Sequence, residues 1–150
     1  MVENVYEVTS AKYGFFDLVL FLGVLYHLRN PMAAFDRVRS VMKPDAGLFV
    51  ETHLLDNAVL LPDGSSTTLE ALSPALRDLP IWQFYSRDRL NSDATNKWAP
   101  NMEGLKQAVE EAEFEVLDSH ILGTRGFVKG RAVIDDQVSR FRRMDSAKSI

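Results

Sequence analysis

The chain has 150 residues, of which 46% are hydrophobic and 25% charged, a balance typical of a single globular domain. The net charge of -4 argues against sequence-independent nucleic-acid binding, which needs an excess of basic residues, and the lack of cysteine excludes disulfides and thiolate metal sites. No apolar run reaches the roughly 18 residues that span a membrane, and no basic start leads into an apolar signal segment, so we expect a cytoplasmic protein without a membrane partner.

The first predicted core element is the apolar run 16–22. It is rich in Val, Leu and Phe after its single Asp17, which is typical of a strand buried on both faces of a parallel sheet. Gly23 ends this strand, and the polar pair Tyr26 and His27 follows directly.

A helix and a second strand come next. Asn30 and Pro31 are typical of a helix N-terminus, and apolar residues then recur at helical spacing over 34–42. The segment 43–47 ends the helix and turns the chain into a strand over 48–54. A strand, a helix and a strand in this order predict a crossover unit with parallel strands.

The segment 55–97 has no clear period and contains several prolines and a Gly-Ser-Ser-Thr-Thr stretch. It predicts a long irregular insertion with one short helix near 69–79. Long excursions inside a small domain usually serve as lids or binding loops.

The C-terminal part is more regular. An amphipathic helix is predicted over 101–113, and the runs 114–122 and 126–134 predict two strands of an antiparallel hairpin. Residues 135–150 predict a polar tail.

Several short motifs stand at the ends of these elements. They are Gly23-Val24-Leu25-Tyr26-His27-Leu28, Asn30-Pro31, Glu51-Thr52 and Trp98-Ala99-Pro100-Asn101. Their order resembles the second half of a class I S-adenosylmethionine-dependent methyltransferase, in the branch that includes the tRNA wobble-uridine carboxymethyltransferases. The resemblance implies an α/β fold over residues 1–134: a partial Rossmann-like sheet of three parallel strands and one antiparallel C-terminal hairpin strand, with flanking helices.

The resemblance also implies roles for single residues. Leu22 and Gly23 would approach the methionine part of S-adenosylmethionine, at the strand ends where open parallel sheets bind ligands. Tyr26 resembles the family tyrosine at the reaction centre. Arg125 resembles a family arginine that reaches the same cleft and pairs with a carboxylate or phosphate. The best-known members of the branch use a carboxylated form of the cofactor, which would suit this arginine. His27 could act as a general base, or its ring could cap the turn by bonding to backbone.

The sequence departs from the family in its cofactor site. It has no Gly-x-Gly loop, and no acidic residue follows a second strand to hold the ribose. We therefore expect the C-terminal fragment of a methyltransferase, with an incomplete cofactor site and little activity alone. In the family the strand 16–22 pairs with the first strand, so we expect its bare edge to bind a second copy or a partner, or to lower solubility.

Other interpretations stay open at this point. Glu51, His53 and Asp56 could form a metal cluster with His27. The aromatic residues of the insertion could stack on a planar acceptor or could anchor the insertion to the core. The acceptor could be a tRNA base, a sugar or a small metabolite. The chain could also be a non-catalytic interaction module that pairs with a partner subunit, or a doubly wound α/β binding protein unrelated to methyl transfer.

Overall fold

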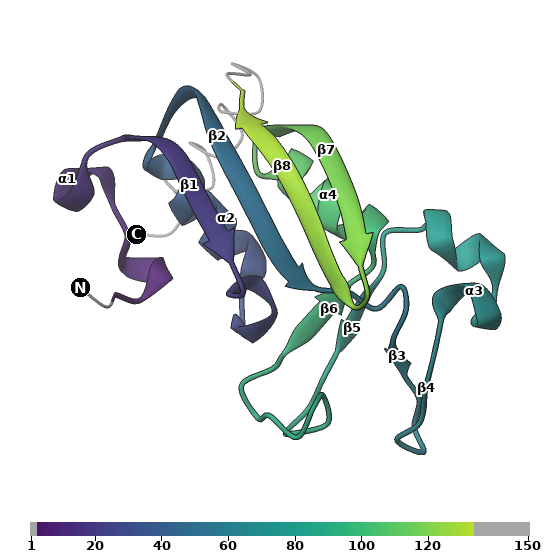
Figure 1. Cartoon of the computed structure of the whole chain (residues 1–150). Helices are drawn as coiled ribbons and strands as arrows, with labels where there is room; N and C mark the ends of the chain where they lie inside the picture. Colours follow the sequence, from purple (N-terminus) through teal and green to yellow (C-terminus); the bar gives the residue numbers. More distant parts are fainter. Residues whose placement is uncertain (1–2, 134–150) are drawn as a thin grey trace, which may run out of the picture.

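The computed structural model describes residues 3–133, which form a four-stranded sheet with its main helices on one face (Figure 1). In spatial order the strands are β1 (Phe16–Leu22), β2 (Met42–His53), β8 (Arg125–Ala132) and β7 (Phe114–Leu122). β1 and β2 are parallel, and β8 pairs antiparallel with both β2 and β7. Three strands therefore run one way and β8 runs the other, which confirms the predicted partial α/β sheet.

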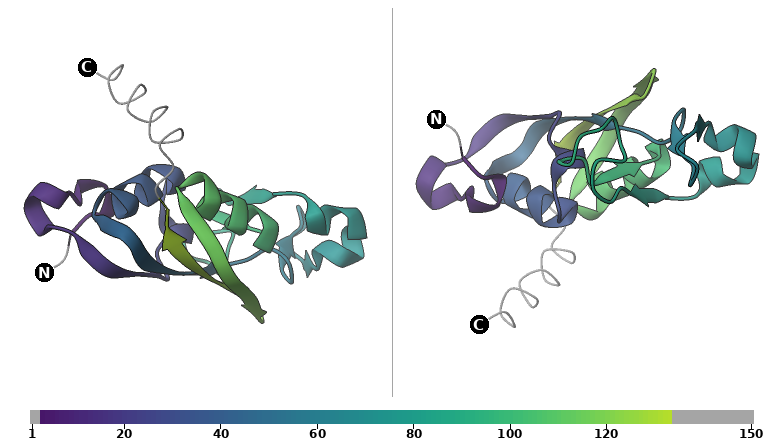
Figure 2. Two further views of the ribbon diagram at one scale, coloured as in Figure 1. Left: turned by 90° about the horizontal axis from the view of Figure 1, so that it is seen from above. Right: turned by 90° about the horizontal axis from the view of Figure 1, so that it is seen from below.

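The two main helices lie on the same face of the sheet (Figure 2). They are α2 (Pro31–Ser40) and α4 (Met102–Glu111). Each begins after an asparagine whose side-chain oxygen accepts a hydrogen bond from a backbone amide of the first turn. Asn30 caps α2 through the amide of Ala33 at 3.1 Å, and Asn101 caps α4 through the amide of Gly104 at 2.8 Å.

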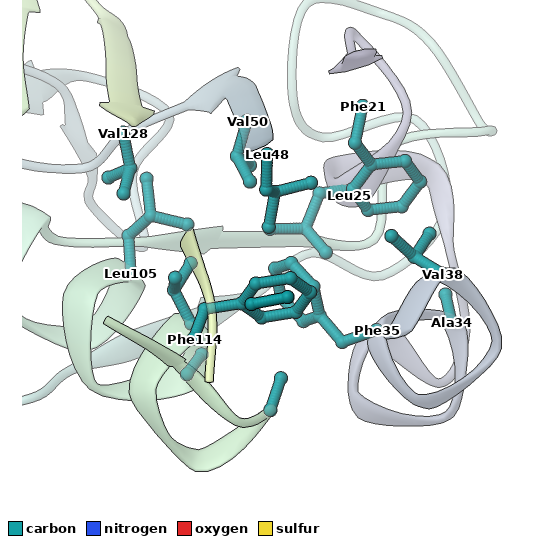
Figure 3. Packing of buried hydrophobic residues seen from close by; sticks show 14 of the residues in the cluster. Phe21, Leu25, Ala34, Phe35, Val38, Leu48, Val50, Leu105, Phe114 and Val128 are labelled. Atoms are coloured by element: carbon teal, nitrogen blue, oxygen red, sulfur yellow. The ribbon is translucent and has the colours of Figure 1, made fainter. Parts of the chain in front are cut away.

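The hydrophobic core fills the space between these helices and the sheet (Figure 3). Alternate residues of β2 face it, as Leu48 and Val50 are 0% and 1% exposed. Phe35 of α2 and Leu105 of α4 meet them from the helical side, and both are fully buried. This core fixes β2, and so it also fixes the carboxyl ends of β1 and β2 where the predicted site lies.

On the opposite face, the described residues leave the middle of β1 and β2 uncovered, while the insertion and the turn after β1 cover only the carboxyl end of β2 (Figure 2). Leu18, Leu20 and Leu22 of β1 are 50%, 61% and 48% exposed, and Phe49 of β2 is 38% exposed. We call these four residues the apolar strip. The prediction that 16–22 is buried on both faces is therefore wrong, because within residues 3–133 no element covers these three leucines and no strand pairs with the outer edge of β1.

The predicted turn at 43–47 lies inside a strand. β2 already begins at Met42, which pairs with Phe16, and the next pair along the ladder is Leu18 with Gly47. The residues between them form a bulge in β2. Asp45 takes φ 59 there, a conformation that aspartate tolerates better than most residues, so a turn-like sequence fits within a continuous strand.

The insertion contains more regular structure than its sequence predicts. Its elements are β3 (Val59–Leu60), β4 (Ser66–Thr67), α3 (Leu69–Leu72), the 3-10 helix η3 (Pro74–Asp78), β5 (Trp82–Phe84) and β6 (Trp98–Pro100). The pairs β3–β4 and β5–β6 are small antiparallel ladders. A second, smaller core holds the insertion together, formed by the buried residues Leu55, Leu69, Tyr85, Leu90 and Ala99.

The N-terminal lead-in carries a 3-10 helix η1 (Val5–Glu7) and a single turn α1 (Ser10–Tyr13), and the 3-10 helix η2 (Leu25–His27) follows β1. No helix between residues 3 and 133 is long and apolar enough to cross a bilayer. The predicted polar tail, 135–150, lies outside the described residues.

Candidate functional site

An ion pair lies at the carboxyl ends of β1 and β2. Arg125, the first residue of β8, gives two hydrogen bonds to the carboxylate of Glu51: Nη2 donates to Oε2 at 2.8 Å, and Nε donates to Oε1. The side chains of Arg125 and Glu51 are 32% and 14% exposed. The bond to Glu51 is the main cause that raises the pKa of Arg125, as expected for a bidentate, charge-assisted pair.

The turn after β1 brings Tyr26 to this ion pair. Gly23 makes the turn with φ +69, and its amide donates to the carbonyl of Glu51 at 3.0 Å. Because this φ favours glycine, the turn explains why glycine stands at the end of β1. The Arg125 guanidinium carbon then lies 4.7 Å from the centre of the Tyr26 ring, a cation–π contact.

His27 is oriented by the insertion. Its Nδ1 lies 2.9 Å from the hydroxyl of Thr95, and that hydroxyl donates to the carboxylate of Asp93 at 2.6 Å. Since the Thr95 proton is used in the bond to Asp93, the hydroxyl can only accept from Nδ1–H of His27, which leaves Nε2 as a proton acceptor. The hydrogen bonds from Thr95 lower the pKa of Asp93. The His27 ring therefore bonds to a side chain, and not to backbone as the alternative interpretation required.

The structure thus brings together most of the residues that the sequence singled out. Tyr26, His27 and Arg125 meet around the end of β1, beside Gly23, and Leu22 lies next to them at the end of the strand. The rings of Tyr26 and His27 are 4.0 Å apart between centres. The catalytic and cofactor-binding roles of these residues stay predictions.

Three partners were missed as such from the sequence. The sequence indicates Glu51 as part of a family motif and as a metal ligand but not as the partner of Arg125, and it does not indicate Asp93 or Thr95 as partners of His27. The Asp-x-Thr spacing is typical of a local turn that fixes both side chains. In this turn Asp93 Oδ1 also accepts a hydrogen bond from the Thr95 amide at 2.8 Å, and aspartate is favoured at its position.

The metal interpretation is not supported by the contacts of the residues involved. Glu51 is engaged by Arg125, and Asp56 accepts from the amide of Met102 at 2.8 Å. In the part of the chain that the structure describes, no group of three or more His, Asp or Glu side chains is placed to hold a metal ion.

The aromatic residues of the insertion divide between the two interpretations. Tyr85 is 1% exposed and anchors the smaller core, and burial raises its pKa to about 12. Phe84 is 58% exposed, and its ring centre lies 4.8 Å from that of Trp98. Phe84, Tyr85 and Trp98 line a cavity of about 210 Å³ together with basic residues that include Arg29 and Lys97.

His53, at the end of β2, is buried with 5% exposure and lies opposite Arg125 in the ladder. Burial lowers its pKa, and the charge of Arg125 lowers it further, while Glu51 offsets part of the effect. The folded protein therefore protonates this imidazole at a lower pH than an exposed histidine.

This burial predicts a pH-dependent stability. The pKa of His53 in the folded protein lies below its unfolded value of about 6.5. The contribution of the neutral His53 to the free energy of unfolding is therefore fully present above pH ~6.5 and is lost as the pH falls toward the folded pKa. Urea titrations between pH 7.5 and 5 should show a smaller decline for His53→Gln than for the wild type. The exposed His120→Gln serves as the control, and equal declines for both variants would contradict the assignment.

Sequence comparisons with known proteins point to one family. A family model described as a methyltransferase domain matches residues 2–119. A tRNA U34 carboxymethyltransferase from Syntrophotalea carbinolica is 42% identical over 43 residues, which are 29% of this chain and 13% of that protein. One from Photobacterium profundum is 31% identical over 72 residues, 45% of this chain and 22% of that protein. The matched segments thus span less than a quarter of these curated relatives.

Solved structures share the fold at low sequence identity. The Burkholderia thailandensis 1,6-didemethyltoxoflavin-N1-methyltransferase with bound 1,6-didemethyltoxoflavin and S-adenosylhomocysteine is 14% identical, with a TM-score of 0.59 over 89% of this chain and 50% of that one. An O-methyltransferase family protein from the same organism is 15% identical, with a TM-score of 0.57 over 89% of this chain and 35% of that one. The chain spans half or less of the length of these structures.

Proposed function

Because this chain belongs to the methyltransferase-domain family, we propose that it carries the second half of an S-adenosylmethionine-dependent methyltransferase and helps to transfer a methyl or related one-carbon group. One observation carries the proposal: Tyr26, His27 and the Arg125–Glu51 pair converge at the carboxyl ends of β1 and β2. Ligands of open parallel sheets bind outside these strand ends. On this proposal residues 3–133 hold the methionine part of the cofactor and a second copy or a partner completes the site.

The turn at Gly23 fits the methionine part of the cofactor. A Cβ added to Gly23 would meet one atom within 4 Å, Glu51 Oε2 at 3.8 Å. The strand end therefore has open space beside the ion pair. Leu22 is 48% exposed beside it. S-adenosylmethionine is the proposed cofactor, and its carboxylated form is the alternative. The guanidinium of Arg125, which would bind the extra carboxylate, already gives two hydrogen bonds to Glu51. When bound, the cofactor supplies an electrophilic carbon on a sulfonium.

The residues of this chain would position the acceptor and move its proton. His27 can take a proton at Nε2, because Thr95 holds Nδ1–H. The Tyr26 hydroxyl and the Arg125 guanidinium would orient acceptor or cofactor oxygens. Positioning alone supplies much of the rate in a reaction between two bound groups. Both curated relatives are named for tRNA U34, so a tRNA wobble uridine is one candidate acceptor and a small metabolite is the other.

Calorimetric titration of the purified chain with S-adenosylhomocysteine tests the cofactor site. We expect binding at about micromolar affinity if pairing of two copies completes the site, and its loss in Gly23→Val, whose side chain would fill the open strand end. Gly14→Val is the matched control, since Gly14 also has a positive φ, +73, but lies before β1. A folded wild-type chain that binds nothing would overturn a cofactor site on this chain.

The uncovered edge of β1 favours a second candidate, a non-catalytic module that pairs with a partner subunit. The apolar strip lies on the sheet face next to this edge and exposes four large side chains, three of them on β1, and bare edges and apolar patches both promote association. We propose that the edge binds a second copy of the chain when no other partner is present.

Sedimentation velocity checks this pairing. The wild-type chain should sediment as a dimer or larger species, and Leu20→Lys should shift it toward the monomer, because a lysine on the edge opposes strand pairing. Leu72→Lys is the matched control, since Leu72 is 47% exposed but lies in α3, away from the sheet. A wild-type chain that stays monomeric at high concentration would contradict the pairing.

A further inference from the structure

A separate cavity adjoins the ion pair on the side of the insertion. Its volume is about 310 Å³, within the range of small-ligand sites. The polar residues that line it are His53, Ser66, Arg89, Asn91 and Thr124. Thr124 directly precedes Arg125, and His53 lies opposite Arg125 in the ladder. The cavity therefore shares its wall with the proposed reaction site.

A buried imidazole without a partner lines this cavity. His53 is 95% buried, and its Nε2 has no hydrogen-bond partner among residues 3–133. A buried polar group normally has a partner, because its desolvation otherwise goes uncompensated. Because protein atoms cover Nε2, a ligand in the cavity supplies this partner only if the ring turns toward the cavity.

The cavity also carries a positive charge without a paired acid. Arg89 donates through Nη2 to the carbonyls of Leu61 at 3.1 Å and Pro62 at 3.3 Å, which places its guanidinium but leaves its charge in full. None of the cavity-lining residues is acidic, and no ion pair joins Arg89 to an acid within the described chain. Glu51, the carboxylate nearest along β2, is engaged by Arg125.

The lining thus offers hydrogen-bond donors to an oxygen-bearing anion. The guanidinium of Arg89, the hydroxyls of Ser66 and Thr124 and the amide of Asn91 can all donate, and the His53 ring forms the wall beside them. We propose that this cavity binds an oxyanion group, a carboxylate or a phosphate, of the methyl acceptor. The part of the proposal that names the acceptor rests on the proposed function; the anion site itself does not.

NMR of the full chain tests the site with two simple probes. The signals of its three histidines are assigned with His→Gln variants, and the chain is titrated at pH 7 with inorganic phosphate, with acetate, and with sodium chloride at matched ionic strength. We expect a saturable shift of the His53 signal with phosphate or acetate and none with chloride. A response to phosphate alone identifies a phosphorylated ligand, and one to acetate alone a carboxylate ligand.

A matched pair of arginine variants locates the effect. Arg89→Gln should weaken binding of the anion about tenfold, because it removes one charge-assisted contact. Arg87→Gln should leave binding of the anion unchanged, because Arg87 lines the separate cavity of about 210 Å³. The proposal is overturned if neither probe shifts His53 in the folded wild type, or if both variants weaken binding equally.

Titration of the same samples with S-adenosylhomocysteine separates this inference from the proposed function. If the chain binds the anion but not S-adenosylhomocysteine, the anion site stands and its assignment to a methyl acceptor fails. If the chain binds S-adenosylhomocysteine but its His53 signal does not respond to the anions, the proposed function stands and the anion site is overturned.

Discussion

Replacing Asn101 with alanine should lower the free energy of unfolding by about 3 kcal/mol, roughly three times the effect of the same change at Asn30. Both asparagines cap a helix through a side-chain oxygen. Asn101 is 0% exposed and has further bonds: Oδ1 also accepts from the amide of Ile81 at 2.9 Å, and Nδ2 donates to the carbonyl of Leu79 at 2.7 Å.

The difference arises from the groups that each change leaves behind. Asn30→Ala exposes one amide near the surface, where water replaces the lost bond. Asn101→Ala leaves the buried amide of Gly104 and the partly buried amide of Ile81 without their side-chain partner, and an unpaired buried group costs about 1–3 kcal/mol. The side chain of Asn101 thus ties residues 79–81 of the insertion to the start of α4.

Urea unfolding followed by circular dichroism at 222 nm measures both variants. Asn101→Asp provides a second control, because it keeps the two accepted bonds and loses the bonds donated by Nδ2, the shortest of them to Leu79, although it adds a buried charge. We expect Asn101→Ala to be far less stable than Asn30→Ala. Equal effects at the two positions would show that Asn101 acts as an ordinary helix cap.

The order of the main elements could be predicted because its signals are local. The apolar run of β1, the Asn-Pro start of α2 and the short link between β7 and β8 each depend on neighbouring residues alone. The end of α4 was less predictable, because Glu113 takes φ 65 directly after that helix. Such a position usually carries glycine because the left-handed region strains other residues.

Burial could not be predicted in the same way. Leu18, Leu20 and Leu22 have the composition of a doubly covered strand, yet they are exposed, because burial depends on which segments pack on each face. The bulge in β2 was missed for a related reason, since Lys43-Pro44-Asp45 reads as a turn until the parallel partner β1 fixes the ladder on both sides of it.

The candidate site depends on contacts between residues distant in the sequence. Nothing in the spacing of Tyr26 and Arg125 indicates that they touch; only the family resemblance placed them in one cleft. The Glu51–Arg125 pair depends on the register that sets His53 opposite Arg125. A slip of one residue would send Arg125 to the other face of the sheet, and a single sequence does not reveal that register.

Removing the charge of Arg125 alone should destabilise the chain by about 2–3 kcal/mol, because Arg125→Met leaves the largely buried carboxylate of Glu51 without its partner. Removing both charges, in Arg125→Met with Glu51→Gln, should restore most of this loss, since a pair of neutral side chains carries little desolvation penalty. Urea unfolding of both single variants and the double variant gives the coupling energy, which we expect to be at least about 1.5 kcal/mol.

The pair Arg131–Glu115 is the matched control, because it also joins two neighbouring strands of the sheet but is 47% and 46% exposed. Its coupling should be below about 0.5 kcal/mol. Equal coupling in the two pairs would mean that the site pair is screened like any surface pair.

The double variant of the site pair also separates stability from ligand binding. It should fold with nearly wild-type stability and yet bind S-adenosylhomocysteine more weakly than the wild-type chain, if Arg125 orients a ligand. A stable double variant with unchanged affinity would restrict Arg125 and Glu51 to a structural role and leave Tyr26 and His27 to carry the site.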